Sequence, residues 1–263
     1  MSAPSLATRA LDLVASEWIK LRSVRSTYWA LLVTVVTPVA VSALVAFAFS
    51  SAPHISGHKS APPPDPLLPE VISLEYAVIA VSVLGVLAFT GEYSTGLIRV
   101  TFTAAPRRRA VLAAKAAVLA AVMLVVGEAV AFASFGLAQA VLAGHGEGVS
   151  LGHPGVPGAV LCAGLLLSVC GLLGLALGAV IRHTAGGIAA TIAVILVPGI
   201  VALLPSPWSG RIGRFTLLEA ARQVSALHPA TNLFSPAWSL LVVLAWPAAA
   251  LAIAAALVTR RDA

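Results

Sequence analysis

Six separate runs of apolar residues, each long enough to cross a bilayer, constrain this chain more than any other feature. A transmembrane α-helix needs about 20 such residues to cross about 30 Å of hydrocarbon. The runs occupy residues 28–50, 71–90, 110–143, 156–181, 185–204 and 237–258. Because 59% of the residues are hydrophobic and only 10% are charged, one soluble core could not hide this apolar surface. We therefore predict an all-α integral membrane protein in which residues 1–263 form one transmembrane domain of six helices.

The basic residues divide unequally between the two sides of such a domain. If the N-terminus is cytoplasmic, twelve lysines and arginines lie inside, and Lys59, Arg211, Arg214 and Arg222 lie outside. The positive-inside rule then predicts both termini in the cytoplasm and residues 51–69 on the outer side. The basic residues fall at the ends of apolar runs rather than on an aromatic-rich face, so we expect no nucleic-acid partner.

An amphipathic pattern covers residues 6–25, before the first span. Leu11, Val14, Trp18 and Leu21 form one apolar stripe on a helical wheel, and a polar stripe that includes Lys20 lies nearly opposite. Such a helix lies in the membrane interface and contacts lipids. The alternative is a simple cytoplasmic extension of the first span.

The loop between the second and third spans has features that membrane topology alone does not explain. Its sequence is GEYSTGLIRVTFTAAPRRR (residues 91–109). Ser94 or Thr95 can cap a short helix, and Gly96 relaxes the turn before it. The apolar residues that follow are too few to enter the bilayer, but they could fill a groove on a partner. The arginine run 107–109, taken alone, also fits a topology anchor that meets anionic lipid.

Two segments carry a resemblance to a known family: SEWIKLRSVRSTYW (residues 16–29) and the loop 91–109. With six spans and a structured loop before the last one, the chain resembles the membrane-spanning permease subunits of type-2 ATP-binding-cassette (ABC) exporters, of actinobacterial type. The resemblance covers nearly the whole chain, although the other spans match in pattern only. It implies a bacterial inner or plasma membrane location. It also implies a separate ATPase subunit and a second permease subunit, identical or different, as partners.

In that family the loop between spans two and three holds a coupling helix that sits against the ATPase. On this resemblance, Glu92 caps or braces the loop and Arg99 meets acidic groups of the ATPase. Leu97, Ile98 and Phe102 would fill its groove. The complete set of expected coupling residues is Glu92, Ser94, Thr95, Gly96, Leu97, Ile98, Arg99 and Phe102.

The chain has no ATP site of its own, since no lysine follows a glycine-rich GxxxxGK[ST] turn. We therefore expect no enzyme activity and no cofactor in this subunit. An intramembrane hydrolase is an alternative class, but neither HExxH nor GxSxG occurs. A non-transporting membrane sensor or anchor is the other alternative.

Residues 205–236 are predicted to hold a short helix that lies in the outer interface or re-enters the membrane. Phe215, Leu218 and Leu227 are apolar positions in a stretch with no proline or glycine between residues 215 and 228. The family resemblance agrees, because it places re-entrant helices before the last span.

Glu128 lies near the middle of the third span, where an ionisable group is a functional candidate. The alternative is a neutral acid that is hydrogen-bonded to a neighbouring helix.

His54 and His58 are four residues apart in the loop 51–69, but no acidic or thiol partner stands at ligand spacing, so we predict no metal site. Small residues in the fourth span predict close helix packing; they are Gly164, Ser168, Gly171, Gly174 and Gly178.

Overall fold

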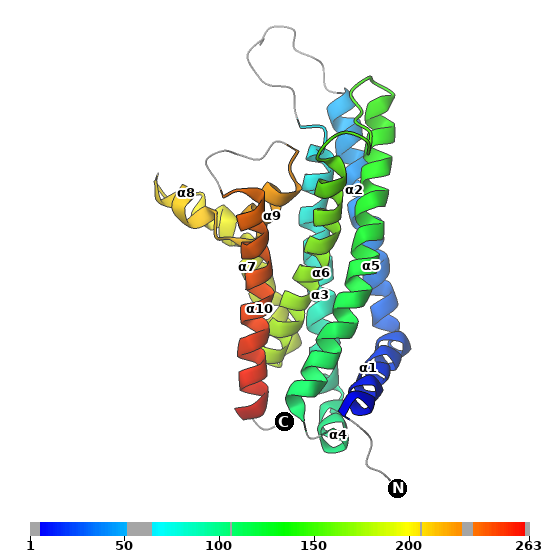
Figure 1. Ribbon diagram of the computed structural model, residues 1–263, viewed down its shortest axis with the longest axis vertical. Coiled ribbons are helices and arrows are strands. Elements are labelled where there is room, and N and C mark those ends of the chain that lie inside the picture. The colour runs from blue at the N-terminus through cyan, green and yellow to red at the C-terminus, as the bar shows by residue number, and fades with distance from the viewer. Residues whose placement is uncertain (1–5, 52–64, 106, 206, 228–233, 261–263) are drawn as a thin grey trace.

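The protein is an all-α molecule with six helices that are long and apolar enough to span a membrane (Figure 1). The computed structural model describes residues 6–51, 65–105, 107–205, 207–227 and 234–260. All regular secondary structure within these residues is α-helical, as predicted. Lipid offers no hydrogen-bond partners to a backbone, and a helix satisfies its own N–H and C=O groups.

The spanning helices coincide closely with the predicted apolar runs. They are α2 (Arg25–Ser51), α3 (Leu68–Ser94), α5 (Arg108–Ala143), α6 (Val156–Ile181), α7 (Thr184–Val201) and α10 (Pro236–Arg260). Helix α7 ends three residues before the predicted limit of residue 204, whereas α3 extends beyond its predicted run at both ends. Helix α5 has 36 residues and is therefore roughly 54 Å long, so it protrudes from a bilayer.

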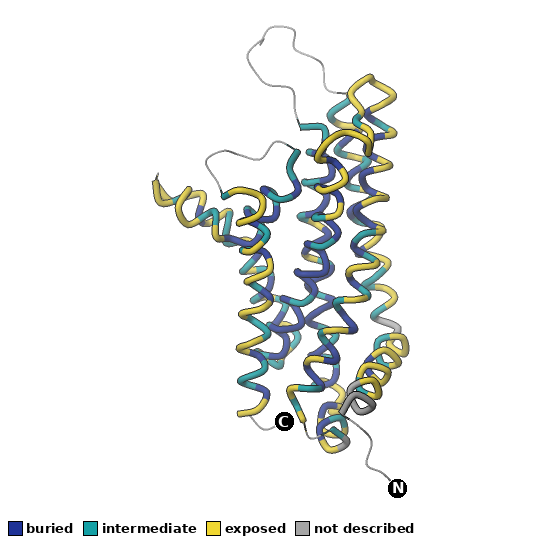
Figure 2. The backbone as a smooth tube through the Cα atoms, in the orientation of Figure 1, coloured by how far each residue is buried: buried dark blue, intermediate teal, exposed yellow. Residues whose placement is uncertain are grey.

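Helix α6 occupies the centre of the bundle and packs against α3, α5 and α10. In its most apolar stretch 72% of the residues are buried, against 22% in α2 and in α7. Figure 2 shows the same contrast between the buried middle of the molecule and the exposed outer helices. The outer faces of α2, α7 and α10 are apolar and suit contact with lipid.

Glycines allow α3 and α6 to approach until their backbones touch. A Cβ atom added at Gly174 would clash with the carbonyl oxygen of Ser82, and one added at Gly85 would clash with that of Gly171. The Oγ atom of Ser168 donates a hydrogen bond of 3.1 Å to the carbonyl of Ala120. The predicted packing role of the small residues in this span is therefore confirmed.

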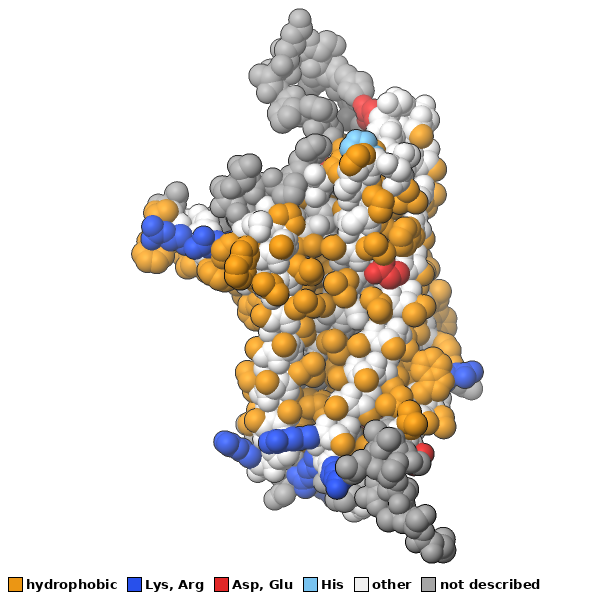
Figure 3. Space-filling view, in the orientation of Figure 1, with side chains coloured by type: hydrophobic (Ala, Val, Ile, Leu, Met, Phe, Trp, Pro, Cys, Tyr) orange, Lys and Arg blue, Asp and Glu red, His pale blue; other side chains and the backbone are white. Residues whose placement is uncertain are grey.

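The two ends of the bundle differ in composition. The terminal end holds the starts of α1 (Leu6–Ser23) and α5, the end of α10 and the short helix α4 (Leu97–Ala104) (Figure 1). Basic side chains gather at this end in Figure 3. The opposite end, called the α8 end below, holds α8 (Trp208–Gly213) and α9 (Leu217–Ser225).

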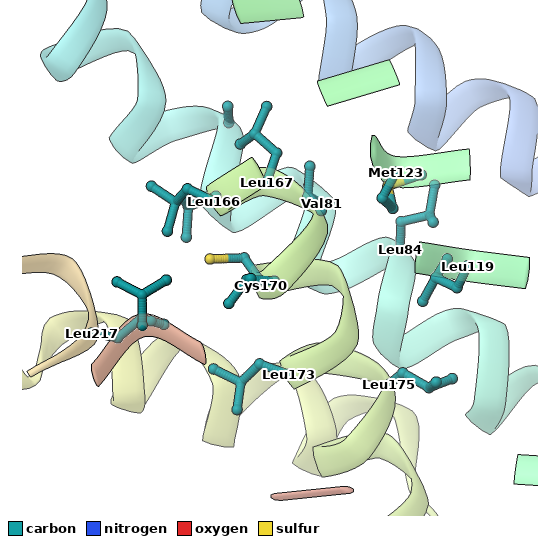
Figure 4. Packing of buried hydrophobic residues seen from close by; sticks show 14 of the residues in the cluster. Val81, Leu84, Leu119, Met123, Leu166, Leu167, Cys170, Leu173, Leu175 and Leu217 are labelled. Carbon is teal, nitrogen blue, oxygen red and sulfur yellow. The ribbon is translucent and has the colours of Figure 1, made fainter. Parts of the chain in front are cut away.

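Helix α9 confirms that residues 205–236 contain a helix, and it is anchored firmly to the bundle. Leu217 is buried and lies beside Cys170 and Leu173 of α6 (Figure 4). The Nε atom of Arg222 donates a hydrogen bond of 2.8 Å to Glu75 of α3. The side chain of Gln223 donates to the carbonyl of Phe234 at 3.0 Å.

Candidate functional site

The most unusual polar group of the described chain is a cluster of four charged side chains at the terminal end, three of them buried. Its members are Glu17 and Lys20 of α1, Glu92 of α3 and Lys115 of α5, and we call it the ion cluster. Glu17, Glu92 and Lys115 are each less than 9% exposed. Residues up to 98 positions apart in the chain thus meet at one buried point.

Lys115 joins the two acids. Its Nζ atom lies 2.7 Å from Oε1 of Glu92 and also forms an ion pair with Glu17. Lys20 makes a second connection between the same acids, at 2.8 Å from Glu17 and 3.1 Å from Glu92. Two acids and two bases balance, so the cluster carries no net charge into the protein interior. Breaking any one partner would leave a buried charge uncompensated.

The ion cluster also reaches α4. The Nζ atom of Lys20 donates a third hydrogen bond of 3.2 Å to Oγ1 of Thr101, and that hydroxyl donates to Glu92 at 3.4 Å. Lys20 therefore uses all three of its donors. Helices α1, α3, α4 and α5 are linked through a single set of polar contacts, so a displacement of α4 acts on the other three helices.

The pKa of Lys20 is shifted by its place in the cluster. Burial acts to lower this pKa, but the hydrogen bonds and negative charges of Glu17 and Glu92 outweigh burial and raise the pKa above 10.5. A raised pKa means that the charged form is favoured in the folded state. The stabilising contribution of Lys20 is therefore complete at neutral pH and is lost only as the pH rises through the raised value.

Helix α1 divides its residues between bundle and surface differently from the two stripes of the wheel pattern. Leu11, Val14 and Trp18 are exposed, as an interfacial stripe requires. Leu21 instead packs against the core together with Leu13. Lys20, assigned to the opposite polar stripe, points into the ion cluster beside Glu17, which the sequence reasoning missed. The residues on the inner face, Leu13, Glu17, Lys20 and Leu21, follow helical spacing.

Beside the ion cluster lies a cavity of about 380 Å³ between α1, α2, α3 and α5. The cluster forms its polar wall, and Leu84, Leu87 and Ala88 of α3 form part of its apolar wall. The cavity shows that α1 is not packed along its whole length against the spans. The described contacts that fix α1 include the ion cluster, the packing of Leu13 and Leu21, and a hydrogen bond of 2.8 Å from Tyr28 to the carbonyl of Arg22.

Helix α4 has two distinct faces, and this corrects part of the predicted coupling set. Ile98 and Phe102 are buried in the hydrophobic core, at 3% and 9% exposure, and are not free to enter a groove on a partner. Leu97 and Val100 are exposed on the opposite side, at 53% and 64%. A helix of eight residues that also packs on its own bundle can offer only one face to a partner. Arg99 is exposed on the free face.

The turn into α4 also differs from the expected cap. The N-cap residue is Gly96, in the left-handed region at φ 72°, and no side chain caps the helix. The hydroxyls of Ser94 and Thr95 donate instead to the carbonyl of Gly91, at 3.0 and 2.9 Å, and so complete the end of α3. Glycine is favoured at residue 96 because a residue with a side chain would be strained at a positive φ angle.

The arginines that follow α4 are not a uniform run. The guanidinium of Arg108 covers the ring of Phe102 at 5.2 Å and donates a hydrogen bond of 3.3 Å to the carbonyl of Val258 in α10. Arg107 and Arg109 are exposed. Arg108 thus fixes the buried face of α4 to the last span, whereas its two neighbours remain accessible at the surface.

Glu128 lies in the α5 span and is partly exposed on the side of the bundle. Its Oε2 atom is buried without a hydrogen-bond partner. A Cβ atom added at Gly164 of α6 would lie 2.6 Å from this oxygen, so the glycine makes room for the carboxyl group. The predicted alternative, a hydrogen bond to a neighbouring helix, is not found among the described residues.

No group of three or more His, Cys, Asp or Glu residues in the described chain is placed to hold a metal ion. His54 and His58, which we considered as ligands, lie outside the described residues.

These features define a multi-pass α-helical membrane protein in which the short helix α4 is held at one end of the bundle. A comparison with models of known protein families finds no match, and a comparison with curated proteins finds none either.

Proposed function

We propose that this chain is the membrane-spanning permease subunit of a type-2 ABC exporter. It would form a substrate path across the membrane, and a separate ATPase subunit would drive it through residues 91–109. The single observation that carries the proposal is the position of α4. This helix connects two spans at the terminal end, presents a free apolar face and is braced from behind by the ion cluster.

The free face of α4 suits a protein partner. Leu97 and Val100 are exposed apolar residues three positions apart, which places them on one side of the helix. Arg99 beside them provides a positive charge for acidic groups. A short amphipathic helix that enters a groove is a recurrent way for one protein to bind another. The coupling contact is therefore assigned to Leu97, Arg99 and Val100, with Ile98 and Phe102 as internal packing.

The rigid support of α4 favours transmission of force rather than simple attachment. Thr101 contacts both Lys20 and Glu92, and Phe102 packs in the core beneath Arg108. A push on α4 by an ATPase subunit would therefore reach α1, α3, α5 and α10 together. An anchor or sensor helix needs no such connection to several spans.

The remaining parts of the proposal concern location and partners. The basic residues at the terminal end support a cytoplasmic location for both termini, by the positive-inside rule. A bacterial inner or plasma membrane is the location that the family resemblance implies. The helix α1 then lies along the inner membrane surface with Leu11, Val14 and Trp18 in contact with lipid. A second permease subunit, identical or different, completes the transporter.

The proposal is tested by photocrosslinking in intact cells. A photoreactive amino acid at Val100 should capture a protein that contains a GxxxxGK[ST] sequence, identified by mass spectrometry. The same group at Val125, which is 72% exposed in the α5 span, is the control and should capture no such protein. If Val100 captures no ATP-binding protein, the permease proposal fails and a non-transporting anchor or sensor is favoured.

A further inference from the structure

An apolar groove of about 770 Å³ runs along α10 at the α8 end of the molecule. Its lining includes Phe215, Phe234, Trp238, Leu241, Trp246 and Ala249. Three of these rings are held in place by described contacts. Phe215 and Phe234 meet edge to face at 5.1 Å, and the indole of Trp246 donates a hydrogen bond of 3.0 Å to the carbonyl of Phe215. The groove is thus a defined feature of the fold.

The length of the groove matches one leaflet of a bilayer. Trp238 and Ala249 lie on α10 and are eleven residues apart, which corresponds to roughly 16 Å along the helix. Half of a hydrocarbon core of about 30 Å is close to this length. Trp238 is 63% exposed near the start of α10, and tryptophan favours the level of the lipid headgroups. The groove therefore descends from the headgroup level toward the bilayer centre.

A positive charge stands beside the two phenylalanine rings that line the groove. The guanidinium of Arg214 lies 5.3 Å from the ring centre of Phe215 and 4.8 Å from that of Phe234. Among the described residues its Nε atom has no hydrogen-bond partner, and none of their ion pairs includes Arg214. Arg222, by contrast, is neutralised by Glu75 and Glu219. Figure 3 shows basic side chains next to hydrophobic ones around α8.

We propose that this groove binds an anionic phospholipid from the leaflet at the α8 end. One acyl chain lies along Leu241, Trp246 and Ala249, and the phosphate group lies at Arg214. Charge complementarity, apolar lining and a length of one leaflet all fit this ligand. The site is independent of the transport proposal and of which side of the membrane the α8 end faces.

The tryptophans of the groove allow a direct test. Trp18, Trp29 and Trp208 are replaced by phenylalanine, so that only Trp238 and Trp246 fluoresce, and the protein is reconstituted in phosphatidylcholine nanodiscs. Either dibrominated phosphatidylglycerol or dibrominated phosphatidylcholine is included at equal mole fraction, because bromine on an acyl chain quenches tryptophan on contact. We expect the anionic lipid to occupy the groove with about a fivefold preference, which corresponds to about 1 kcal/mol for one basic residue.

Two variants locate the headgroup contact. Arg214→Gln should abolish the preference for the brominated anionic lipid, while quenching by brominated phosphatidylcholine stays unchanged and so reports an intact groove. Arg211→Gln is the matched control and should retain the preference, since Arg211 is an exposed arginine of α8 and none of the ring contacts between described residues includes it. Equal quenching by both lipids in the parent protein would overturn the proposal. Absence of quenching by either lipid would also overturn it, and would show that protein covers the groove.

Discussion

The Nζ atom of Lys115 lies 2.7 Å from Oε1 of Glu92, and both side chains are buried where α5 and α3 approach the terminal end of the bundle. Neither residue is near the other in the chain, and each sits at the border of a long apolar helix. A buried ion pair adds little net stability compared with apolar packing, but it penalises every arrangement in which the two charges separate. It therefore specifies how α3 and α5 meet.

Replacing Glu92 with glutamine should destabilise the protein. The change leaves Lys115 and Lys20 with only Glu17 as a charged partner, and loss of one partner from a buried ion pair costs about 3 to 5 kcal/mol. Thermal unfolding in detergent should show a lowered midpoint. The control is Asp12→Asn, because Asp12 is an exposed acid on the same helix as Glu17, and its midpoint should stay unchanged. Equal midpoints for the two variants would contradict the structural role of the cluster.

Gly174→Ala should disrupt the contact between α3 and α6, because the added Cβ atom would clash with the carbonyl oxygen of Ser82. We expect a loss of about 1 to 3 kcal/mol, which is typical of overpacking in a rigid interior. Gly136→Ala in α5 is the matched control, since a Cβ atom there meets nothing within 4 Å. Because alanine favours helix over glycine, the control should be neutral or more stable by up to about 1 kcal/mol. Similar unfolding midpoints for both variants would contradict the close helix contact.

The spans were predictable because their signal is local. Twenty apolar residues in a row identify a spanning helix wherever its neighbours lie, and glycine spacing in α6 indicates close packing in the same way. The separate helix α4 was predictable from Gly96 and the apolar residues after it. In each case the sequence of one segment contains the physical cause of the structure.

The sides of the short helices could not be predicted in this way. Whether Phe102 faces a partner or its own core depends on the positions of α5 and α10. The sequence of α4 contains no information about those positions. The wheel of α1 likewise gave an apolar stripe but no indication that Glu17 would be buried. One signal was present: Lys115 and Glu92 are charged residues at the same end of neighbouring apolar runs, and buried charges need opposite partners.

The proposed topology predicts opposite labelling of two cysteines. In a background without Cys162 and Cys170, Ser150→Cys at the α8 end should react with an impermeant maleimide added to intact cells, because Ser150 is exposed in the turn after α5. Thr103→Cys on the exposed side of α4 should react only after lysis. The reverse result would place the termini outside and remove α4 from any cytoplasmic ATPase.

The two faces of α4 should separate binding from stability. Leu97→Ala and Val100→Ala together remove the exposed apolar contacts, and loss of a central interface anchor costs about 2 kcal/mol or more, roughly thirtyfold in affinity. ATPase co-purification and transport-linked ATP hydrolysis should fall, while the unfolding midpoint stays unchanged. Phe102→Ala is the contrasting variant, because deleting this buried ring costs about 3 to 5 kcal/mol of stability. If the exposed pair leaves both binding and hydrolysis at wild-type levels, α4 is not the coupling contact, because no other described apolar side chain on this helix faces outward.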